Sequence, residues 1–490
     1  MNIFPQPKSL TEQAGAFCFG SRVVMHVNCS LSERRKTLLR SLWNRFSLIG
    51  STLEIAENSL LPAPAFCARI GQAELPALEA ADEYAAVVTP AGIGLAAKDE
   101  TGLLHAFYSL IQAIDPISLD YGSEVLEIPC LTIHDHPSMD MRSIHVCVFP
   151  ETTLTLLEKC FTMAGLLKCS HIVLEFWGTI QYDALPEMAW SGRSYSKRQI
   201  KPLIELANDF GMEVVPMTNH LGHASQARGG MGKHAVLDQN PRLATLFEPD
   251  GWTWCLSNPR VHTLLRRFRE ELIELCGEGK YFHLGCDEAY SYASCRRCAG
   301  KDRVEMLARY LNGLAAELDE QGRRGFIWGD QFLETEAWKG TGYIATSRPD
   351  QMTHLALEKL DRRLIIADWQ YNLTEEEKIR SAESFREKGF DVVLCPWDGG
   401  GAKNTVCLAK AADRQHLSGL MVTTWHHLPT MMMHFPDHLS AAWNGADYTP
   451  DPHVPFTSSV LIRKLMPKPS RFEDSGFYSW EVDSTYTVNP

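Results

Sequence analysis

Long hydrophobic runs are missing from this chain of 490 residues. A stretch of about eighteen or more apolar residues, which a membrane-spanning helix requires, occurs nowhere. The N-terminus also lacks the basic region followed by an apolar region that is typical of a secretory signal. The sequence therefore predicts a protein of the cytoplasm that has no membrane partner.

Basic residues are also fewer than acidic ones. The chain has 47 Lys and Arg against 60 Asp and Glu, a formal net charge of −13. Affinity for nucleic acid comes largely from clustered basic side chains, so we expect no nucleic-acid partner. Low-complexity tracts and short-period repeats are likewise missing, which excludes repeat architectures.

Paired cysteine motifs are scarce, although the chain has 14 cysteines. Many of these, such as Cys160, stand among apolar residues, which favours reduced thiols over disulfides. A single C-x-x-C pair, Cys295 and Cys298, supplies only two of the four ligands of a structural zinc. We expect no metal and no cofactor. Any zinc at this pair would need Cys276 or a nearby histidine, and would brace the loop that carries Glu288 rather than take part in chemistry.

What the chain does contain is a series of short, apolar, β-branched runs, separated by segments with helical spacing of apolar residues. Strands of this kind that alternate with helices predict a parallel sheet covered by helices. Eight such units favour a closed barrel over a doubly wound open sheet. The eight runs span 141–148, 171–177, 212–219, 280–288, 324–331, 363–371, 391–398 and 419–426.

The predicted fold class is α/β, a (β/α)8 TIM barrel preceded by a smaller α+β domain. Strand-like runs and one helix-like run place the α+β domain at residues 1–135, with prolines near the junction. The barrel then takes 136–445. Residues 446–490 form a C-terminal extension rich in Pro, Ser and aromatic residues, to which we assign no role.

Most of the predicted strands end in polar or aromatic residues, and a barrel of this type has its active site at the C-terminal ends of its strands. Asp287 and Glu288 are adjacent at one such end. Placed there, one acid can hold a group of the substrate while the other exchanges a proton. The alternative is that they are solvated loop acids.

Tryptophans follow several of the same runs. Flat aromatic rings around a pocket are a common means of binding sugars, although each Trp taken singly is also compatible with a core or rim position. The tryptophans are Trp328, Trp369, Trp397 and Trp425.

The segment HLGCDE, from His283 to Glu288, resembles the H-x-G-x-D-E signature of glycoside hydrolase family 20, the β-N-acetylhexosaminidases. The resemblance extends over most of residues 80–430. Residues 99–114 are similar to a helix of the family's N-terminal domain, 133–143 to the start of its barrel, and 214–224 to its third-strand motif. The pattern is closest to the intracellular, hexosaminidase D-like branch.

The resemblance implies an exo-acting β-N-acetylhexosaminidase that removes terminal GlcNAc or GalNAc with retention of configuration. The substrate's own 2-acetamido oxygen would attack the anomeric carbon and form an oxazolinium ion. Asp287 would orient the acetamido group, and Glu288 would protonate the leaving oxygen and then deprotonate water. His223, with Glu175 behind it, would support Glu288, and His283 would lie in the same supporting layer. A core or helix-capping role for His223 is the alternative.

The resemblance also implies which residues bind the sugar of an N-acetylhexosamine-terminated oligosaccharide or glycoconjugate. Arg142 would bind hydroxyls, Asp398 a distal hydroxyl, and Tyr371 would replace a family tyrosine at whose position Pro396 stands. The identity of the sugar and the oligomeric state stay open. The predicted sugar-binding set is Arg142, His223, Trp328, Trp369, Tyr371, Trp397, Asp398 and Trp425.

Three other functions fit the same residues. One is a catalytically silent carbohydrate-binding barrel. Another is a metal-dependent barrel hydrolase that uses His220, His223, His283 and an acid as ligands. The third is an endo-acting or modified-sugar hydrolase, because the last two strands depart from the family pattern, as at His427 where the family has Glu.

Overall fold

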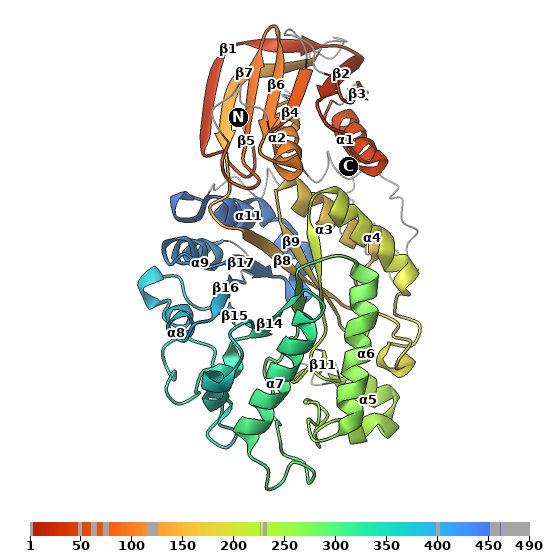
Figure 1. Cartoon of the computed structure of the whole chain (residues 1–490), viewed down its shortest axis with the longest axis vertical. Coiled ribbons are helices and arrows are strands. Elements are labelled where there is room, and N and C mark those ends of the chain that lie inside the picture. Colours follow the sequence, from red (N-terminus) through yellow and green to blue (C-terminus); the bar gives the residue numbers. More distant parts are fainter. Residues whose placement is uncertain are drawn as a thin grey trace.

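The chain forms two units, a sheet domain at the top of Figure 1 and a barrel below it. In this computed structural model, the described residues are 3–47, 51–59, 66–71, 78–114, 126–225, 227–228, 233–397, 402–450 and 461. The predicted C-terminal extension therefore lies almost entirely outside the described residues.

The N-terminal unit is an open sheet of seven strands in the order β1-β7-β5-β6-β4-β2-β3. Helices α1 (Glu33–Phe46) and α2 (Glu100–Gln112) begin after Ser32 and Asp99, whose side chains accept backbone N–H groups. Helix α2 is almost wholly buried, and its Tyr108 donates a hydrogen bond to the Phe210 carbonyl of the barrel unit. The strands are β1 (Ser9–Phe19), β2 (Arg22–Val27), β3 (Thr52–Ala56), β4 (Phe66–Ile70), β5 (Tyr84–Thr89), β6 (Gly92–Ala97) and β7 (Leu126–Asp135).

The second unit is a closed barrel of eight parallel strands in the order β10-β13-β14-β15-β16-β17-β8-β9, which confirms the predicted fold class. Each strand falls within one of the eight apolar runs. Gly419 sits where β17 meets β8; its φ is +143°, and a Cβ there would come within 2.0 Å of the Met141 carbonyl oxygen. The strands are β8 (Met141–Val148), β9 (His171–Phe176), β10 (Glu213–Met217), β13 (Tyr281–His283), β14 (Arg324–Trp328), β15 (Ile365–Trp369), β16 (Asp391–Cys395) and β17 (Gly419–Thr423).

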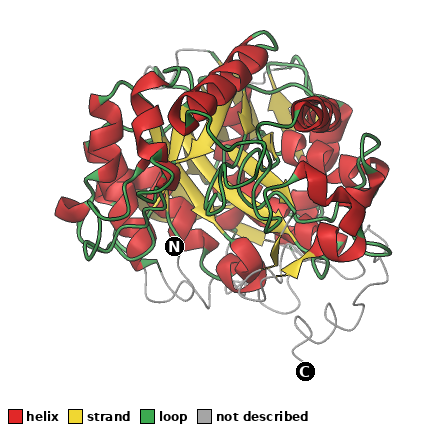
Figure 2. Cartoon of the chain, turned by 90° about the horizontal axis from the view of Figure 1, so that it is seen from below, coloured by secondary structure: helices red, strands yellow, loops and turns green. Residues whose placement is uncertain are grey.

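Helices surround the strands, as Figure 2 shows from below. The regular alternation fails once: between β14 and β15 the chain forms only short 3-10 turns, the longest over Thr353–Lys359. The helices are α3 (Leu154–Leu166), α4 (Lys197–Asp209), α5 (Ala235–Gln239), α6 (Pro259–Cys276), α7 (Arg303–Asp319), α8 (Ser381–Glu387), α9 (Lys403–Arg414), α10 (Leu428–Met432) and α11 (Phe435–Asn444). A two-stranded ribbon is made by β11 (Ala227–Arg228) and β12 (Lys233–His234).

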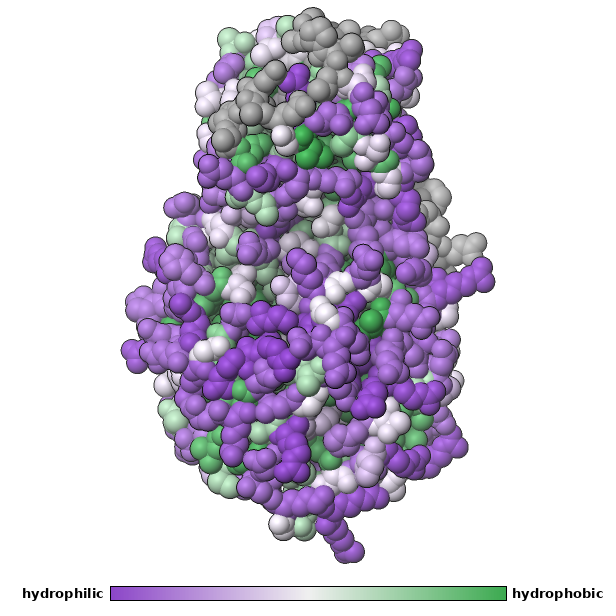
Figure 3. Space-filling view, in the orientation of Figure 1, coloured by the Kyte–Doolittle hydropathy of each residue, from purple (hydrophilic) through white to green (hydrophobic). Residues whose placement is uncertain are grey.

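The face shown in Figure 3 is mostly hydrophilic, with hydrophobic residues scattered over it. None of the helices in the described part of the chain is both long and apolar enough to cross a lipid bilayer. Large hydrophobic side chains that are substantially exposed are few among the described residues: Tyr290, Met352 and Leu355.

A buried ion pair joins the two units. Lys168, which is fully buried between α3 and β9, places its Nζ 3.0 Å from Asp135 Oδ2 at the end of β7. Tyr84 donates to the same oxygen at 2.7 Å, and Trp443 of α11 donates to the other at 2.9 Å. Burial lowers the pKa of Lys168, and the charge of Asp135 opposes that shift.

The Lys168→Met variant should lose about 3–5 kcal/mol in the free energy of unfolding, because it leaves the Asp135 carboxylate buried without its cation. Chemical denaturation of the purified protein measures this loss. The double variant with Asp135→Asn should recover a large part of it, since no unpaired charge remains. A loss below 1 kcal/mol in the single variant would contradict the assignment.

Arg142 belongs to this junction and not to the sugar site. It lies at the N-terminal end of β8, only 1% exposed, and donates to the carbonyl oxygens of Lys168 and Met139 and to Asp82 Oδ2. The acid pair lies at the opposite, C-terminal end of the barrel strands. The prediction that Arg142 binds sugar hydroxyls is therefore wrong, because the barrel separates it from the site.

Candidate active site

The acid pair follows β13, a strand of only three residues, Tyr281–His283. The strand ends because the backbone turns left-handed: φ is +67° at Gly285, +80° at Cys286 and +46° at Glu288. In a regular strand neighbouring side chains point to opposite faces. The left-handed residues break that alternation and allow Asp287 and Glu288 to face one partner, at a cost of order 1–3 kcal/mol for each strained non-glycine residue.

That partner is His223, in the loop after β10. Its Nε2 lies 3.3 Å from Asp287 Oδ2 and 3.1 Å from Glu288 Oε2. Burial favours the neutral ring, but the two carboxylates outweigh it and raise the pKa of His223 to about 10. At neutral pH the three residues therefore form a cluster of two carboxyl groups around one imidazolium.

The two acids differ in their surroundings. Burial raises the pKa of Asp287, against the opposing charge of His223, and its Oδ1 is buried without a hydrogen-bond partner among the described residues. Burial also pushes the pKa of Glu288 upward, but hydrogen bonds from His223 and Tyr290 hold it below its usual value. The unpartnered Asp287 oxygen is thus available to a donor on a ligand.

Asp330 holds the backbone of the acid-pair loop, the segment 284–302 between β13 and α7 that carries Asp287 and Glu288. It follows β14, and its Oδ2 accepts the backbone N–H of Glu288 at 3.0 Å while its Oδ1 accepts Trp369 Nε1 at 3.0 Å. Burial and the charge of Asp287 raise the pKa of Asp330 to about 7. Asp330 lies within the apolar run 324–331, and nothing in the sequence indicates that it accepts a hydrogen bond from the loop after the neighbouring strand.

Glu288 has two further aromatic partners that the sequence analysis missed. Tyr290 donates its hydroxyl to Glu288 Oε1 at 2.7 Å, and Trp252 donates its Nε1 to the Glu288 carbonyl at 2.5 Å. The Trp252 ring also lies 4.6 Å from the His223 ring. Trp252 was not predicted because it lies in the loop just before α6 and not at a strand end. The W-T-W segment with Trp254 was the available signal.

Three of the predicted aromatic residues form one contact network at the mouth. Trp425, with φ at +44°, donates its Nε1 to the Tyr371 hydroxyl at 2.7 Å. The Tyr371 and Trp397 rings are 5.8 Å apart, and all three side chains are partly exposed. Trp369 is almost buried beside them and is held by Asp330. These positions are compatible with the predicted contacts to a sugar.

Trp328 is different, because it is fully buried. Its ring packs 4.4 Å from His283 and 5.8 Å from Trp425. His283 is itself buried, and burial holds its pKa well below the usual value, so its ring is neutral. Both residues form the floor of the barrel mouth. His283 thus occupies the supporting layer. The Trp328 Nε1 is buried without a hydrogen-bond partner among the described residues, and a direct contact of this ring with a sugar stays a prediction.

Glu175 does not lie behind His223 as expected. Its Oε2 is 3.0 Å from His145 Nε2 and 3.1 Å from the Cys147 thiol, and its Oε1 accepts Asn219 Nδ2 at 2.6 Å. His145 and Cys147 both belong to β8. They supply Glu175 with partners inside the barrel, which directs its carboxylate away from His223. Asp398 lies outside the described residues.

The metal-dependent hydrolase site predicted as an alternative, with His220, His223, His283 and an acid as ligands, is not favoured. His220 has both ring nitrogens engaged, one with the Thr218 carbonyl at 2.7 Å and the other with Arg269 Nη1 at 2.9 Å. His283 points into the floor. The three histidines therefore do not gather around a common point.

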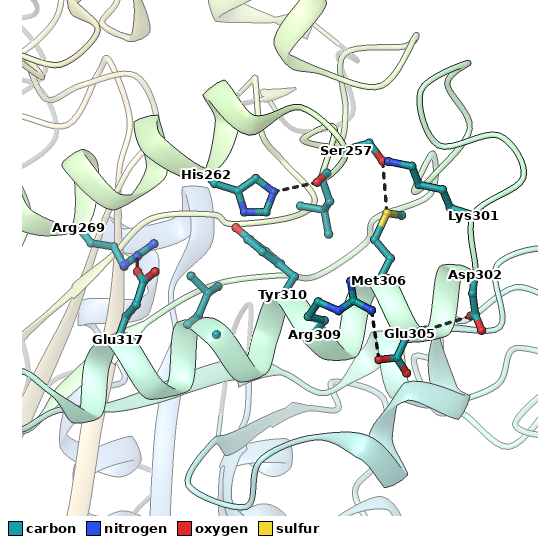
Figure 4. Close-up of a pocket in the computed structure, with 13 residues that line it drawn as sticks. Ser257, His262, Arg269, Lys301, Asp302, Glu305, Met306, Arg309, Tyr310 and Glu317 are labelled. Carbon is teal, nitrogen blue, oxygen red and sulfur yellow. Dashed lines mark hydrogen bonds and ion pairs between the residues drawn. The ribbon is translucent and has the colours of Figure 1, made fainter.

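The barrel flank carries a separate cavity of about 610 Å³ between α6 and α7 (Figure 4). Tyr310 faces His262 across it, and Glu317 pairs with Arg269 at one end. Neither acid of the pair lines this cavity. Because its lining residues belong to α6, α7 and the segments just before them and include neither acid, we do not assign it to the reaction.

Gly222 brings the His223 loop against the loop that carries Asp287 and Glu288. A Cβ at this position would lie 1.8 Å from the Asp287 carbonyl oxygen. Gly222→Ala should therefore push the loops apart and lower kcat/KM by about 10- to 100-fold, as a displacement of about 1 Å does in active sites. Gly313→Ala in α7 is the matched control, since nothing lies within 4 Å of its Cβ. Equal activity of the two variants would refute this close approach.

A parallel barrel with paired carboxylates at its strand ends, enclosed by aromatic side chains, has the architecture of a glycoside hydrolase. Comparison with known families agrees. The model described as glycosyl hydrolase family 20, catalytic domain, matches residues 170–401, and that described as glycosyl hydrolase family 20, domain 2, matches residues 1–136. The chain belongs to glycoside hydrolase family 20.

Individual relatives are distant. A β-hexosaminidase of Porphyromonas gingivalis is 22% identical over 368 residues, 68% of this chain and 46% of that protein. The chain thus spans about half the length of this curated relative. A β-N-acetylhexosaminidase structure from Bacteroides fragilis superposes with a TM-score of 0.69 at 17% identity, covering 94% of both chains. An exo-β-N-acetylglucosaminidase from Vibrio harveyi, solved with N-acetylglucosamine, gives 0.70 at 16% identity over 94% of this chain and 77% of that one.

Proposed function

We propose that this protein is an exo-acting, retaining β-N-acetylhexosaminidase that uses the substrate's 2-acetamido group as the nucleophile. The observation that carries the proposal is the convergence of Asp287 and Glu288 on His223, with one buried Asp287 oxygen left without a protein partner. Family membership and the hexosaminidase names of relatives support it. The substrate class is an oligosaccharide or glycoconjugate that ends in an N-acetylhexosamine.

In this proposal the free Asp287 Oδ1 accepts the acetamido N–H. That hydrogen bond turns the acetamido oxygen toward the anomeric carbon, and the carboxylate's negative charge stabilises the positive charge that develops on the oxazolinium ring. Burial raises the strength of this interaction because water is excluded. Asp330 and the positive-φ backbone hold the loop in place during the reaction.

Glu288 supplies the proton for the leaving oxygen. In the free protein the imidazolium favours an ionised Glu288, and His223 Nε2 is within 3.1 Å of the carboxylate oxygen that needs the proton. We infer that His223 passes its proton to Glu288 when a bound sugar excludes water from the mouth, and recovers it when water opens the ring. His223 is thus a positioning and proton-storing residue, beyond the supporting role expected from the sequence.

Removing the His223 charge should shift the pH profile. Burial raises the pKa of Asp287 and His223 opposes that shift, so without the imidazolium Asp287 would ionise only at higher pH. His223→Asn should therefore move the acidic limb of kcat/KM to higher pH and lower the plateau by about 10-fold or more. A uniform loss at all pH values would instead indicate a structural role.

The test of function is hydrolysis of the para-nitrophenyl β-glycosides of GlcNAc, GalNAc and glucose by the full chain, with and without a chelator. Release from the acetamido sugars but not from glucose, unchanged by brief chelation, is the expected result. Release from glucose as well would overturn participation of the acetamido group. If no glycoside is hydrolysed but GlcNAc still binds, the result would favour a catalytically silent carbohydrate-binding barrel. If the chelator abolishes hydrolysis, the result would favour a metal-dependent reaction.

We further propose a reducing, cytoplasmic location and the hexosaminidase D-like branch, with neither nucleic acid nor membrane as partner. The support is the absence of disulfides among the 14 cysteines and the net charge of −13. Fractionation of the source cells tests the location. Recovery of the protein in the membrane fraction or the secreted fraction would contradict a cytoplasmic location.

A further inference from the structure

Three thiols and a carboxylate meet at the acid-pair loop. The Sγ atoms of Cys255, Cys295 and Cys298 lie 3.4, 3.6 and 4.0 Å from one another, and Glu248 Oε1 lies 3.3 Å from Cys298 Sγ. The four residues come from two loops that are far apart in the sequence. Only the Cys295–Cys298 pair was visible in the sequence, and Cys276, expected as a partner, is not part of the group.

These distances match a tetrahedral zinc site. With Zn–S bonds of about 2.3 Å, sulfur ligands at the corners of a tetrahedron are about 3.8 Å apart, and a carboxylate oxygen bonds at about 2.0–2.2 Å. A disulfide would join two sulfurs at about 2.05 Å and would leave the third cysteine over. Thiolate ligands also select zinc over hard cations such as Mg²⁺.

The burial of the Glu248 carboxylate also favours a cation at this position. Glu248 is 1% exposed, and its partners are the backbone N–H of Cys295 at 2.6 Å, the Ser294 hydroxyl and the Cys298 thiol, none of which is positively charged. A buried carboxylate without a cation is costly. The bonds to Glu248 Oε2 orient the group so that Oε1 faces the sulfurs, in the manner of outer-shell contacts at metal sites.

We propose that Glu248, Cys255, Cys295 and Cys298 bind one structural Zn²⁺. All four ligand positions come from protein side chains, so the site is closed and does not perform hydrolysis itself. Ser257, whose Oγ lies 3.1 Å from Cys298 Sγ and at the edge of the flank cavity in Figure 4, can donate to the thiolate.

The ion would clamp the acid-pair loop to its neighbour. Cys295 and Cys298 follow Glu288 in the loop after β13, whereas Glu248 and Cys255 flank Trp252, which donates to the Glu288 carbonyl. Ser291 and Thr253 join the same two loops through a hydroxyl contact of 3.0 Å. A zinc at this point holds Trp252 and Glu288 together, although it touches neither the substrate nor the reacting atoms.

Metal analysis of the intact, purified chain, expressed with zinc and handled with a thiol-free reductant, tests the proposal without reference to activity. We expect about one zinc per chain, lost in Cys295→Ser and Glu248→Gln but retained in the matched control Cys276→Ala. The Cys295→Ser substitution should also lower the melting temperature of the protein by several degrees.

Replacement of the zinc by Co²⁺ gives an independent readout if a variant fails to fold. The wild-type protein should acquire the strong visible absorption of tetrahedral, thiolate-bound cobalt. A metal-free wild type whose three thiols react freely or form a disulfide would overturn the proposal. So would iron in place of zinc, or a zinc content that is the same in Cys295→Ser as in the wild type.

Discussion

Replacing Glu288 by Gln should lower kcat on a GlcNAc disaccharide by about 10²–10⁴-fold, because the amide cannot donate the proton that the leaving oxygen needs. The loss should be smaller on a dinitrophenyl glycoside, whose leaving group departs without protonation. Steady-state kinetics on both substrates measure the difference. Glu274→Gln, an exposed position on α6, is the matched control and should retain full activity.

The contrast between the two substrates makes this result specific. A variant that simply misfolds loses activity equally on both, whereas loss of the acid is selective for the poor leaving group. A loss below about tenfold on the disaccharide would mean that Glu288 is not the acid, since general acid catalysis contributes at least 10²-fold in most enzymes. Tyr290, bonded to Glu288 Oε1, would then be examined next.

Replacing Asp287 by Asn should lower kcat by about 10²–10³-fold, because the variant keeps the shape of the side chain but loses the negative charge that stabilises the oxazolinium ion. A stable thiazoline analogue of that ion should lose affinity in proportion, since it resembles the charged intermediate more than the substrate does. Inhibition constants and kcat for the two proteins measure both effects.

Asp140→Asn is the matched control, because Asp140 is exposed at the opposite end of the barrel. The decisive comparison is between inhibitor and substrate. An Asp287→Asn variant that binds the thiazoline as tightly as the wild type would overturn the assignment of Asp287 to the acetamido group.

Local patterns determined the fold and the position of the acid pair within it. Strands buried on both faces must be apolar throughout, and helices that cover them must be amphipathic, so the eight units could be recognised without any knowledge of contacts. Parallel strands also share one carboxyl edge. That rule alone placed Asp287, Glu288 and the aromatic residues of the later strands at the same end of the barrel.

Tertiary structure decided which side chains meet. Strand β8 is only eight residues long, with Arg142 at its start. The direction of the strand places Arg142 at the interface between the two units, at the opposite end from the acid pair. Trp328 and Trp425 follow similar runs, but packing buries one and leaves the other partly exposed. The hydrophobic pattern of a segment predicts which of its faces is buried. How exposed a given side chain is depends on which neighbouring elements pack against it.

The proposed zinc site also depends on contacts between residues that are distant in the sequence. Cys255 and Cys295 are forty residues apart in the sequence, with helix α6 and strand β13 between them, and their thiols are 3.4 Å apart. No spacing rule connects such positions, because the separation in space depends on how the two loops pack against each other. The sequence alone determined the strands, the helices and the adjacency of Asp287 and Glu288. Only the folded chain decided that His223 lies between those acids and that three cysteines and Glu248 share one corner, because these contacts arise from long-range packing.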